Sequence, residues 1–245
     1  MGYRKRCYQT YISSHFRHLH ALSDRELEHI LKIYRKRFSR FLPEDKKAHI
    51  IDVACGSGHF LYFLQQTGYK NAIGIDLSKE QVEQARKKGI NNVKKADLFK
   101  YLPKFSNYFQ MVIANDIIEH LKKEEIIQFL DLIYTALKPG GTVIISTLNE
   151  MSLFGASLLH SDFTHETGFT PTSLWQVMSI CNFKDIEIFG EGPVAYDFKS
   201  MARLFIWRCV KMALRLYMTI EQGTGRGIWK RRNIFEPRIF AVGIK

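Results

Sequence analysis

The fold of this 245-residue chain is decided by the stretch IIDVACGSGHF, residues 50–60. A short apolar run leads into two glycines, Gly56 and Gly58, and a helical pattern from His59 to Gln66 follows. Buried parallel strands are short and apolar throughout, and glycines in a turn let the backbone approach a ligand closely. The first N–H groups of the helix can receive a negatively charged group. The stretch therefore predicts a strand, a ligand-binding turn and a helix.

The same alternation of patterns continues outward from this stretch. Capping patterns at Ser78 and Thr170 predict helix starts, and the Pro-Gly-Gly turn at 139–141 predicts a helix end. Helices are predicted at 59–66, 78–88, 123–137 and 170–181, and strands at 49–54, 72–76, 92–97, 109–116, 142–147, 185–189 and 238–244. This order predicts an α/β fold, a seven-stranded, mostly parallel, Rossmann-like sheet with helices on both faces.

Charge separates the flanks of the chain from its middle. The net charge of +12 is the balance of +7 in residues 1–48, −4 in 49–198 and +9 in 199–245. We divide the chain into an N-terminal helical flank at 1–48, a core at 49–198, a basic amphipathic helical insertion at 199–235 and a final core strand at 236–245. Basic flanks favour a polyanionic partner, which is a membrane surface, nucleic acid or a phosphorylated substrate.

The flank at 1–48 carries its own helix signals. Ser23 and Glu26 form a capping-box pattern, apolar residues then recur at helical spacing, and Pro43 ends the pattern. The chain starts with basic residues but no apolar signal segment follows them, and no uncharged run is long enough to span a bilayer. We therefore expect a cytoplasmic protein.

The cysteines indicate neither disulfides nor metal binding. Cys7, Cys55, Cys181 and Cys209 form no CxxC pair and have no histidines at metal-ligand spacing. Free thiols in a reducing compartment are expected, and no metal site is predicted.

Two alternatives compete for the glycine turn. It can be a tight turn without a ligand, or it can bind a dinucleotide in a GxGxxG motif. In that motif the three glycine positions would hold Ala54, Gly56 and His59. The missing third glycine weakens the NAD alternative, because that residue allows close packing of the helix around a pyrophosphate.

The motif DVACGSG (52–58) closely resembles the first motif of class I S-adenosylmethionine-dependent methyltransferases, in particular the type 11 and type 23 domains. Asp76 lies 18 residues after Gly58, where the family has an acid that accepts from both ribose hydroxyls. Asp97, in KADLF, matches the residue that binds the adenine amino group. Asn115 matches the motif that lines the methionine end, and LKPGG (137–141) matches the turn before the fifth strand.

The resemblance covers about residues 48–190 and implies a cofactor and its contacts. The cofactor is S-adenosylmethionine, with S-adenosylhomocysteine as product. The residues expected to bind it are Asp52, Ala54, Cys55, Gly56, Gly58, Asp76, Leu77, Asp97, Leu98 and Asn115. Ala54 stands where the family often has glycine, and Cys55 is expected to be small filler rather than a nucleophile.

Histidines supply the candidate catalytic groups. The segment HSDFTHE (160–166), followed by FTPTSL, lies in a long loop and resembles the acceptor side of small-molecule and glycan methyltransferases. A histidine is a natural base for an acceptor hydroxyl, so we rank His165 first and His160 second. His120 follows the fourth strand, where open α/β sheets place their ligand crevice. For all three, purely structural hydrogen bonding is the alternative.

Residues 201–220 combine basic and apolar faces. On a helical wheel Arg203, Arg208, Lys211 and Arg215 fall within an arc of about 140°, and the segment contains no acid. Such a helix suits an anionic membrane surface, while packing of its apolar face on the core is the alternative. The segment GRGIWKRR (225–232) adds further basic charge.

These observations lead to one functional hypothesis and two alternatives. We expect methyl transfer to an acceptor hydroxyl of a small molecule, with a sugar or lipid-linked glycan as candidates, at the cytoplasmic side of a membrane. RNA methylation is the first alternative, because basic flanks also suit phosphates, although the sequence shows no NPPY-like tetrad and no RNA-binding module. The second is a binding module that holds the cofactor without catalysis.

Overall fold

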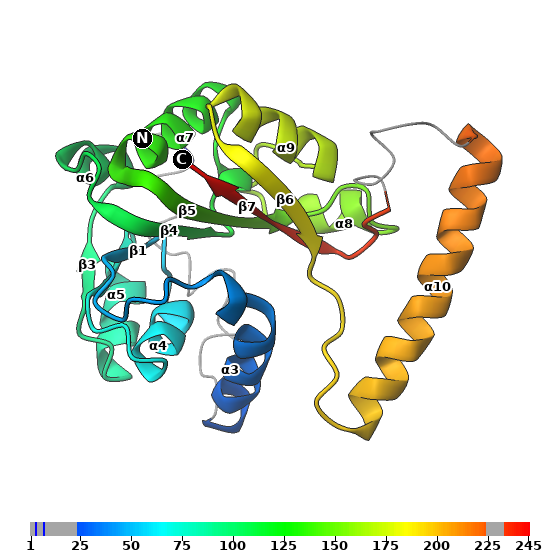
Figure 1. Cartoon of the computed structure of the whole chain (residues 1–245), viewed down its shortest axis with the longest axis horizontal. Coiled ribbons are helices and arrows are strands. Elements are labelled where there is room, and N and C mark those ends of the chain that lie inside the picture. The colour runs from blue at the N-terminus through cyan, green and yellow to red at the C-terminus, as the bar shows by residue number, and fades with distance from the viewer. Residues whose placement is uncertain (1–2, 4–6, 8–23, 224–232) are drawn as a thin grey trace.

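A computed structural model of the chain describes residues 3, 7, 24–223 and 233–245. Its described part contains one seven-stranded sheet in the order β3-β2-β1-β4-β5-β7-β6 (Figure 1). Strand β7 runs antiparallel to both of its neighbours, and the other pairs are parallel. The strands are β1 Ile50–Val53, β2 Ala72–Asp76, β3 Val93–Lys95, β4 Phe109–Asn115, β5 Leu137–Leu148, β6 Lys184–Gly190 and β7 Arg238–Ile244. The predicted fold class is thereby confirmed.

Helices cover both faces of the sheet (Figure 1). One face carries α3 Asp24–Phe38, α4 His59–Gln66 and α5 Lys79–Lys87, and the other carries α6 Leu98–Tyr101, α7 Lys123–Ala136 and α9 Pro171–Ile180. The remaining helical elements are α8 Gly155–Leu159, α10 Phe198–Gln222 and the 3-10 turns η1 Ser39–Phe41, η2 Leu102–Lys104 and η3 Ile118–His120.

Two apolar clusters follow from this layering. Strand residues Ile51 and Val112 pack with Phe129 of α7 on one face of the sheet. Ile50 packs with Phe38 of α3 and Phe60 of α4 on the other. Neighbouring residues of a strand point to opposite faces, so β1, which is buried along its whole length, contributes to both clusters.

The predicted helix caps at Ser78 and Thr170 are present. The Ser78 hydroxyl accepts from the Gln81 N–H, and the Thr170 hydroxyl accepts from the Ser173 N–H. Each bond satisfies a donor that the first turn of a helix leaves unpaired. The predicted cap at Ser23 lies outside the described residues.

The segment LKPGG differs from its prediction as a turn. It forms the first part of β5, which begins at Leu137, because the end of the chain pairs with it. The Gly140 N–H donates to the Lys245 carbonyl, and the Lys245 N–H donates to the Gly141 carbonyl. The partner lies about a hundred residues away in the sequence, so local turn chemistry could not indicate it.

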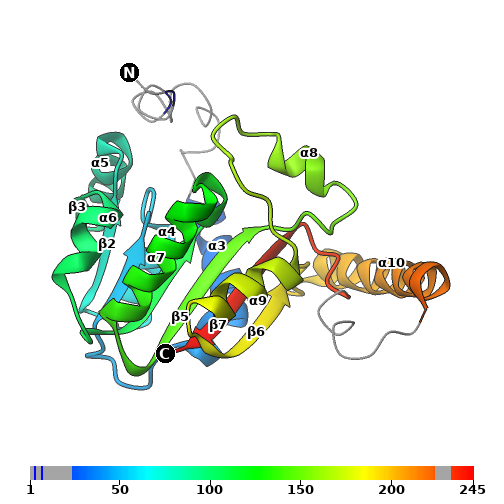
Figure 2. The ribbon, with the colours of Figure 1, turned by 90° about the horizontal axis from the view of Figure 1, so that it is seen from above.

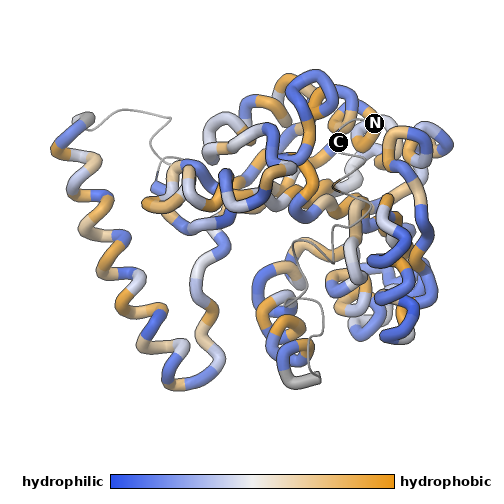
Figure 3. Tube along the Cα trace, turned by 180° about the vertical axis from the view of Figure 1, so that it is seen from behind, coloured by the Kyte–Doolittle hydropathy of each residue, from blue (hydrophilic) through white to orange (hydrophobic). Residues whose placement is uncertain are grey.

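Helix α10 projects from the body of the molecule (Figures 1 and 2). It begins at Phe198 with Asp197 as its N-cap and is therefore longer than the predicted 201–220. Glu236, just before β7, accepts from Trp207 Nε1 at 3.1 Å and from Lys211 Nζ at 2.7 Å. Apolar and polar residues alternate along the helix (Figure 3). No helix in the described ranges is long and apolar enough to cross a bilayer, and GRGIWKRR lies outside those ranges.

Candidate active site at the carboxyl edge of the sheet

The loop after β1 has an unusual backbone. Ala54, Gly56 and Gly58 all adopt positive φ angles, of 56°, 54° and 79°. Glycine tolerates this region, whereas alanine is strained there. A Cβ at Gly58 would lie 3.0 Å from Ile90 and 3.3 Å from Ala85, so this glycine also allows α4 to start close to α5. The loop thus places its backbone at the edge of the sheet, as the sequence predicted.

Asp76, at the end of β2, is fixed beside that loop. Its Oδ2 accepts from the Gly56 N–H at 2.9 Å, and its Oδ1 accepts from the Ser78 N–H at 2.8 Å. Burial raises the pKa of this carboxyl, and the two N–H donors act against the rise. Each carboxylate oxygen can accept more than one hydrogen bond, so both can still receive hydroxyl groups. The adjacent Leu77 is 52% exposed and offers an apolar surface there.

Asp52, on the neighbouring strand β1, has a buried carboxyl group. The residue is 2% exposed, and its Oδ2 has no hydrogen-bond partner among the described residues. Burial and the nearby charge of Asp76 raise the pKa of the Asp52 carboxyl well above its ordinary value. A buried carboxylate is stabilised by a cationic partner. This site therefore fits a ligand that carries positive charge close to a hydroxylated, polar portion.

Cys55 fills space in the same loop. A Cβ on Gly74 of β2 would lie 2.7 Å from its Sγ, so the thiol occupies the room that this glycine leaves. Burial, Asp52 and Asp76 all raise the pKa of the Cys55 thiol. A thiol in such surroundings is a poor nucleophile.

The other predicted cofactor residues lie at the ends of β3 and β4. Asp97 caps α6, and its Oδ1 accepts from the Phe99 N–H at 2.9 Å. Leu98 beside it is half-buried. Asn115 Oδ1 accepts from the Ser146 hydroxyl on β5 at 2.9 Å. Parallel strands end at one edge of the sheet, and ligands of open α/β sheets bind there.

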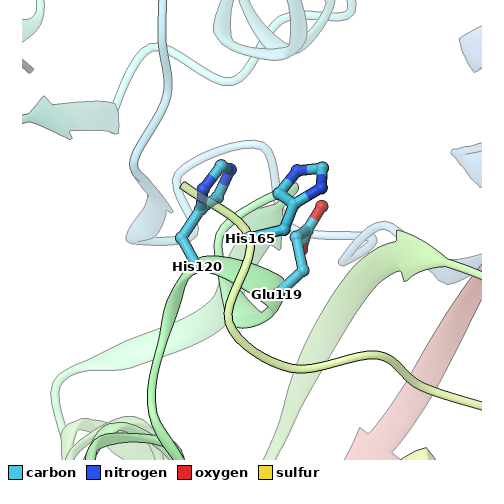
Figure 4. A group of neighbouring side chains, drawn as sticks. All are labelled: Glu119, His120 and His165. Carbon is cyan, nitrogen blue, oxygen red and sulfur yellow. The ribbon is translucent and has the colours of Figure 1, made fainter. Parts of the chain in front are cut away.

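A second group of side chains lies beyond the end of β4. Glu119 and His120 belong to η3, and His165 comes from the long loop before α9 (Figure 4). The rings of His120 and His165 are 4.7 Å apart, centroid to centroid. Glu119 and His120 are buried, and His165 is half-buried. The fold thus brings together two of the three predicted catalytic histidines.

Burial shifts both of the buried groups toward their neutral forms. It raises the pKa of Glu119 to about 8, with a further contribution from Asp116. It lowers the pKa of His120 to about 4, with a further contribution from His165. Two groups whose pKa values are perturbed in opposite directions, at a sheet edge, are typical of a functional site.

His160 lies apart from this group. It is an exposed residue at the carboxyl end of α8, whereas the nearby loop turns His165 inward. The Nδ1 of His165 donates to the Leu159 carbonyl at 2.7 Å. The structure therefore does not bring His160 together with His120 and His165.

Several supporting residues were not identified from the sequence. Thr164 bonds to His120, Thr147 bonds to Glu119, and Arg238 of β7 pairs with Asp116 at the end of β4. Arg238 also lies 3.7 Å from Glu191, which follows β6. Each contact joins segments distant in sequence. One signal was available in the sequence: the polar residues Asp162 and Thr164 lie close to His165 in the segment H-S-D-F-T-H. In the structure both are buried.

The strand order, with an antiparallel seventh strand between β5 and β6, and the glycine loop facing Asp76 define the class I S-adenosylmethionine-dependent methyltransferases. Comparison with known proteins gives the family. The model of the family described as "Methyltransferase domain" matches residues 15–188, which is most of the chain. The protein belongs to this family, and its cofactor is S-adenosylmethionine.

Individual relatives agree with that assignment. A mitochondrial ubiquinone biosynthesis O-methyltransferase of Dictyostelium discoideum is 28% identical over 155 residues, which are 55% of this chain and 47% of that protein. The chain thus spans about half the length of that relative. A SAM-dependent methyltransferase structure from Archaeoglobus fulgidus superposes with a TM-score of 0.64 and 24% identity, over 89% of this chain and 94% of that one.

A second solved structure was determined with the cofactor. Phosphoethanolamine N-methyltransferase 2 of Haemonchus contortus, in complex with S-adenosyl-L-methionine, superposes with a TM-score of 0.61 and 16% identity. The superposition covers 97% of this chain and 60% of that one. At this identity the likeness shows the shared fold alone.

Proposed function

We propose that this protein transfers a methyl group from S-adenosylmethionine to a hydroxyl group of a small acceptor. The observation that carries the proposal is the group of Glu119, His120 and His165, which lies beyond the end of β4, the strand that pairs with β1. Such basic and acidic side chains promote loss of a hydroxyl proton. The relatives named as ubiquinone biosynthesis O-methyltransferases support an oxygen acceptor.

The chain's own residues hold the reactants in place. The cofactor supplies a methyl group on a positively charged sulfur, which needs little covalent help from the protein. In this proposal Asp76 and Asp97 accept from its ribose and adenine, and Asp52 stabilises its positively charged end. His165, more exposed than His120, is the histidine placed to meet the acceptor hydroxyl. Alignment of acceptor and methyl group is then the main contribution to rate.

The named relatives favour an apolar acceptor that carries a hydroxyl group. A cavity of 580 Å³ lies between α3, the segment after β6 and α10. Its wall contains Arg203 and the ion pair of Arg37 with Glu191 (2.7 Å), and none of Glu119, His120 and His165 lines it. A phenolic hydroxyl on an apolar molecule accords with the named relatives. A sugar or lipid-linked glycan, which the sequence suggested, has no support from the relatives.

A panel of acceptors tests this function. Formation of S-adenosylhomocysteine is measured with polyprenylated phenols, lipid-linked glycans and RNA, each in excess of the enzyme. We expect turnover with the phenols and none with RNA. Turnover restricted to RNA would establish the alternative of an RNA methyltransferase. Cofactor binding without turnover on any acceptor would favour a binding module.

We further propose that α10 rests on an anionic membrane surface, from which an amphiphilic acceptor can enter. Several of its apolar side chains are open to solvent: Phe198 is 82% exposed, Phe205 68% and Ile220 77%. The exposed basic residues of the helix, which attract anionic lipids, are Lys199, Arg203, Arg208 and Arg215, whereas Lys211 is paired with Glu236. The alternative from the sequence, packing on the core, is met in part: Trp207 and Lys211 contact Glu236, and Leu204, Val210 and Leu214 are half-buried, while Ser200 is the one described residue of α10 that is buried.

Sedimentation with vesicles tests the membrane proposal. The full chain is expected to sediment with phosphatidylglycerol vesicles and to stay in solution with phosphatidylcholine alone. A variant with Arg203→Glu, Arg208→Glu and Arg215→Glu should lose this binding. The matched control carries the same charge change at the exposed residues Lys87, Lys94 and Lys123. Equal binding of both variants would contradict a specific role for α10.

A further inference from the structure

The side chains of Glu119, His120 and His165 converge on one point. One ligand-type atom from each, a carboxylate oxygen and two ring nitrogens, lies within 4.8 Å of the other two. The three side chains project to the same side from η3 and from the loop that crosses it (Figure 4). The loop is held there by its backbone, because the N–H groups of Glu166 and Thr167 both donate to the Glu119 carbonyl.

The hydrogen bonds of His120 fix its tautomer. The Thr164 hydroxyl donates its proton to Asp162 Oδ1 at 2.7 Å, so its oxygen can only accept from His120 Nδ1, at 2.9 Å. Nδ1 of a neutral ring therefore carries the proton, and Nε2 carries the lone pair. A histidine whose Nδ1–H is held by a polar chain of this kind is typical of metal ligands.

His165 has the same arrangement. Its Nδ1 faces the carbonyl oxygen of Leu159 at 2.7 Å, and a carbonyl can only accept. The lone pair of this ring is again on Nε2. Glu119 is oriented by Thr147, whose hydroxyl donates to its Oε2 at 3.0 Å. Each of the three residues is thus supported from outside the cluster, by a different segment of the chain.

We propose that Glu119, His120 and His165 bind one divalent first-row transition metal ion, such as Zn²⁺ or Mn²⁺. Two imidazole nitrogens and one carboxylate oxygen form a ligand set that suits these ions better than Mg²⁺ or Ca²⁺, which prefer oxygen. Metal bonds of about 2.0–2.2 Å would draw the ligand atoms somewhat closer together. Three protein ligands leave coordination positions open to another molecule.

The metal site extends the proposed methyl transfer, and the role of the metal in catalysis rests on that proposed function. The acceptor hydroxyl takes an open position on the cation, which lowers its pKa, and its proton passes to solvent water. The oxygen then forms a bond to the methyl carbon while the carbon–sulfur bond breaks, and the sulfur keeps the electron pair. The histidines act through the cation in this arrangement and take up no proton.

Cobalt absorption gives a test that does not depend on activity. The metal-free full chain is titrated with Co²⁺ and then with Zn²⁺ as a competitor. We expect visible bands at one Co²⁺ per chain, which Zn²⁺ displaces. Glu119→Gln and His165→Ala should each weaken this binding at least about tenfold. His160→Ala, a change in the same loop but outside the cluster, should leave it unchanged.

Cofactor binding separates the possible failures. All variants should bind S-adenosylhomocysteine like the wild type, which shows that they are folded. Binding of Co²⁺ that is equal in the His165→Ala and His160→Ala variants would overturn the metal site. If the metal binds as expected but chelation leaves methyl transfer unchanged, the catalytic part is wrong and His165 acts directly as a base. If the metal binds and no acceptor is methylated, the proposed function fails while the site stands.

Discussion

The cofactor end and the acceptor end of the sheet edge are built in different ways. At the cofactor end, Asp52, Gly56 and Asp76 come from two adjacent strands and the loop between them, and they lie within 25 residues of sequence. At the acceptor end, His120 and His165 meet across 45 residues of sequence, and Arg238 of β7 joins Asp116 at the end of β4. One end is a local motif, whereas the other is assembled by the tertiary fold.

This difference indicates how the two ends can vary. The geometry of the loop at 52–58 depends on backbone angles that the local sequence dictates. This loop therefore suits a ligand that stays the same, such as the cofactor. The acceptor end depends on a long loop held by a few side-chain contacts, and such loops can change without loss of the core. Mutations should therefore separate binding of the cofactor from turnover.

Replacement of His165 should give the largest effect and separate the two ends. For His165→Ala we expect turnover to fall by roughly 10²–10⁴-fold, as for loss of a group that promotes proton removal. The dissociation constant for S-adenosylhomocysteine should stay within about twofold of the wild-type value, a change of no more than about 0.4 kcal/mol. Steady-state kinetics and calorimetry measure the two quantities, and His160→Ala serves as the control. A parallel loss of cofactor affinity would show that the two ends are coupled.

The same difference explains what the sequence could predict. The strands, the helix caps at Ser78 and Thr170 and the positions of Asp52 and Asp76 follow from short-range patterns, and the structure has them. The sequence could not show that Lys245 pairs with Gly141, or that Glu119, His120 and His165 form one cluster. Those contacts depend on strand order, which local periodicity does not encode.

Asp52→Asn should have a moderate effect: it should raise the stability of the cofactor-free protein and weaken the binding of S-adenosylmethionine. Burial raises the pKa of Asp52 in the folded protein, so the cofactor-free wild type loses stability as pH rises above the unfolded value near 4. The variant has no such charge and should be about 1–3 kcal/mol more stable at neutral pH. It should bind S-adenosylmethionine about tenfold more weakly, because one charge interaction is lost.

Thermal unfolding at several pH values checks the Asp52 prediction. The difference in stability between the variant and the wild type should shrink as the pH is lowered toward 4. Saturating cofactor should also reduce it, because the wild type then gains a cationic partner for the carboxylate. A difference that does not depend on pH would contradict this account of Asp52.

Ala54→Gly should give the smallest effect. Alanine at φ 56° is strained by about 1–2 kcal/mol, and the extra chain entropy of glycine offsets about half of this. We expect a rise in melting temperature of about 1–3 °C and unchanged cofactor affinity. Gly56→Ala is the matched opposite change in the same loop, at φ 54°, and should lower both stability and affinity. A lower melting temperature for Ala54→Gly would show that the loop is not strained at that residue.

Titration calorimetry of S-adenosylmethionine with the wild type and Asp76→Ala tests the central claim most directly. One molecule should bind per wild-type chain, and the affinity of the variant should fall at least about 100-fold, because two hydrogen bonds to a charged group are lost. A wild-type chain that gives no heat with either S-adenosylmethionine or S-adenosylhomocysteine, or a variant that binds equally well, would contradict the assignment of this sheet edge to the cofactor.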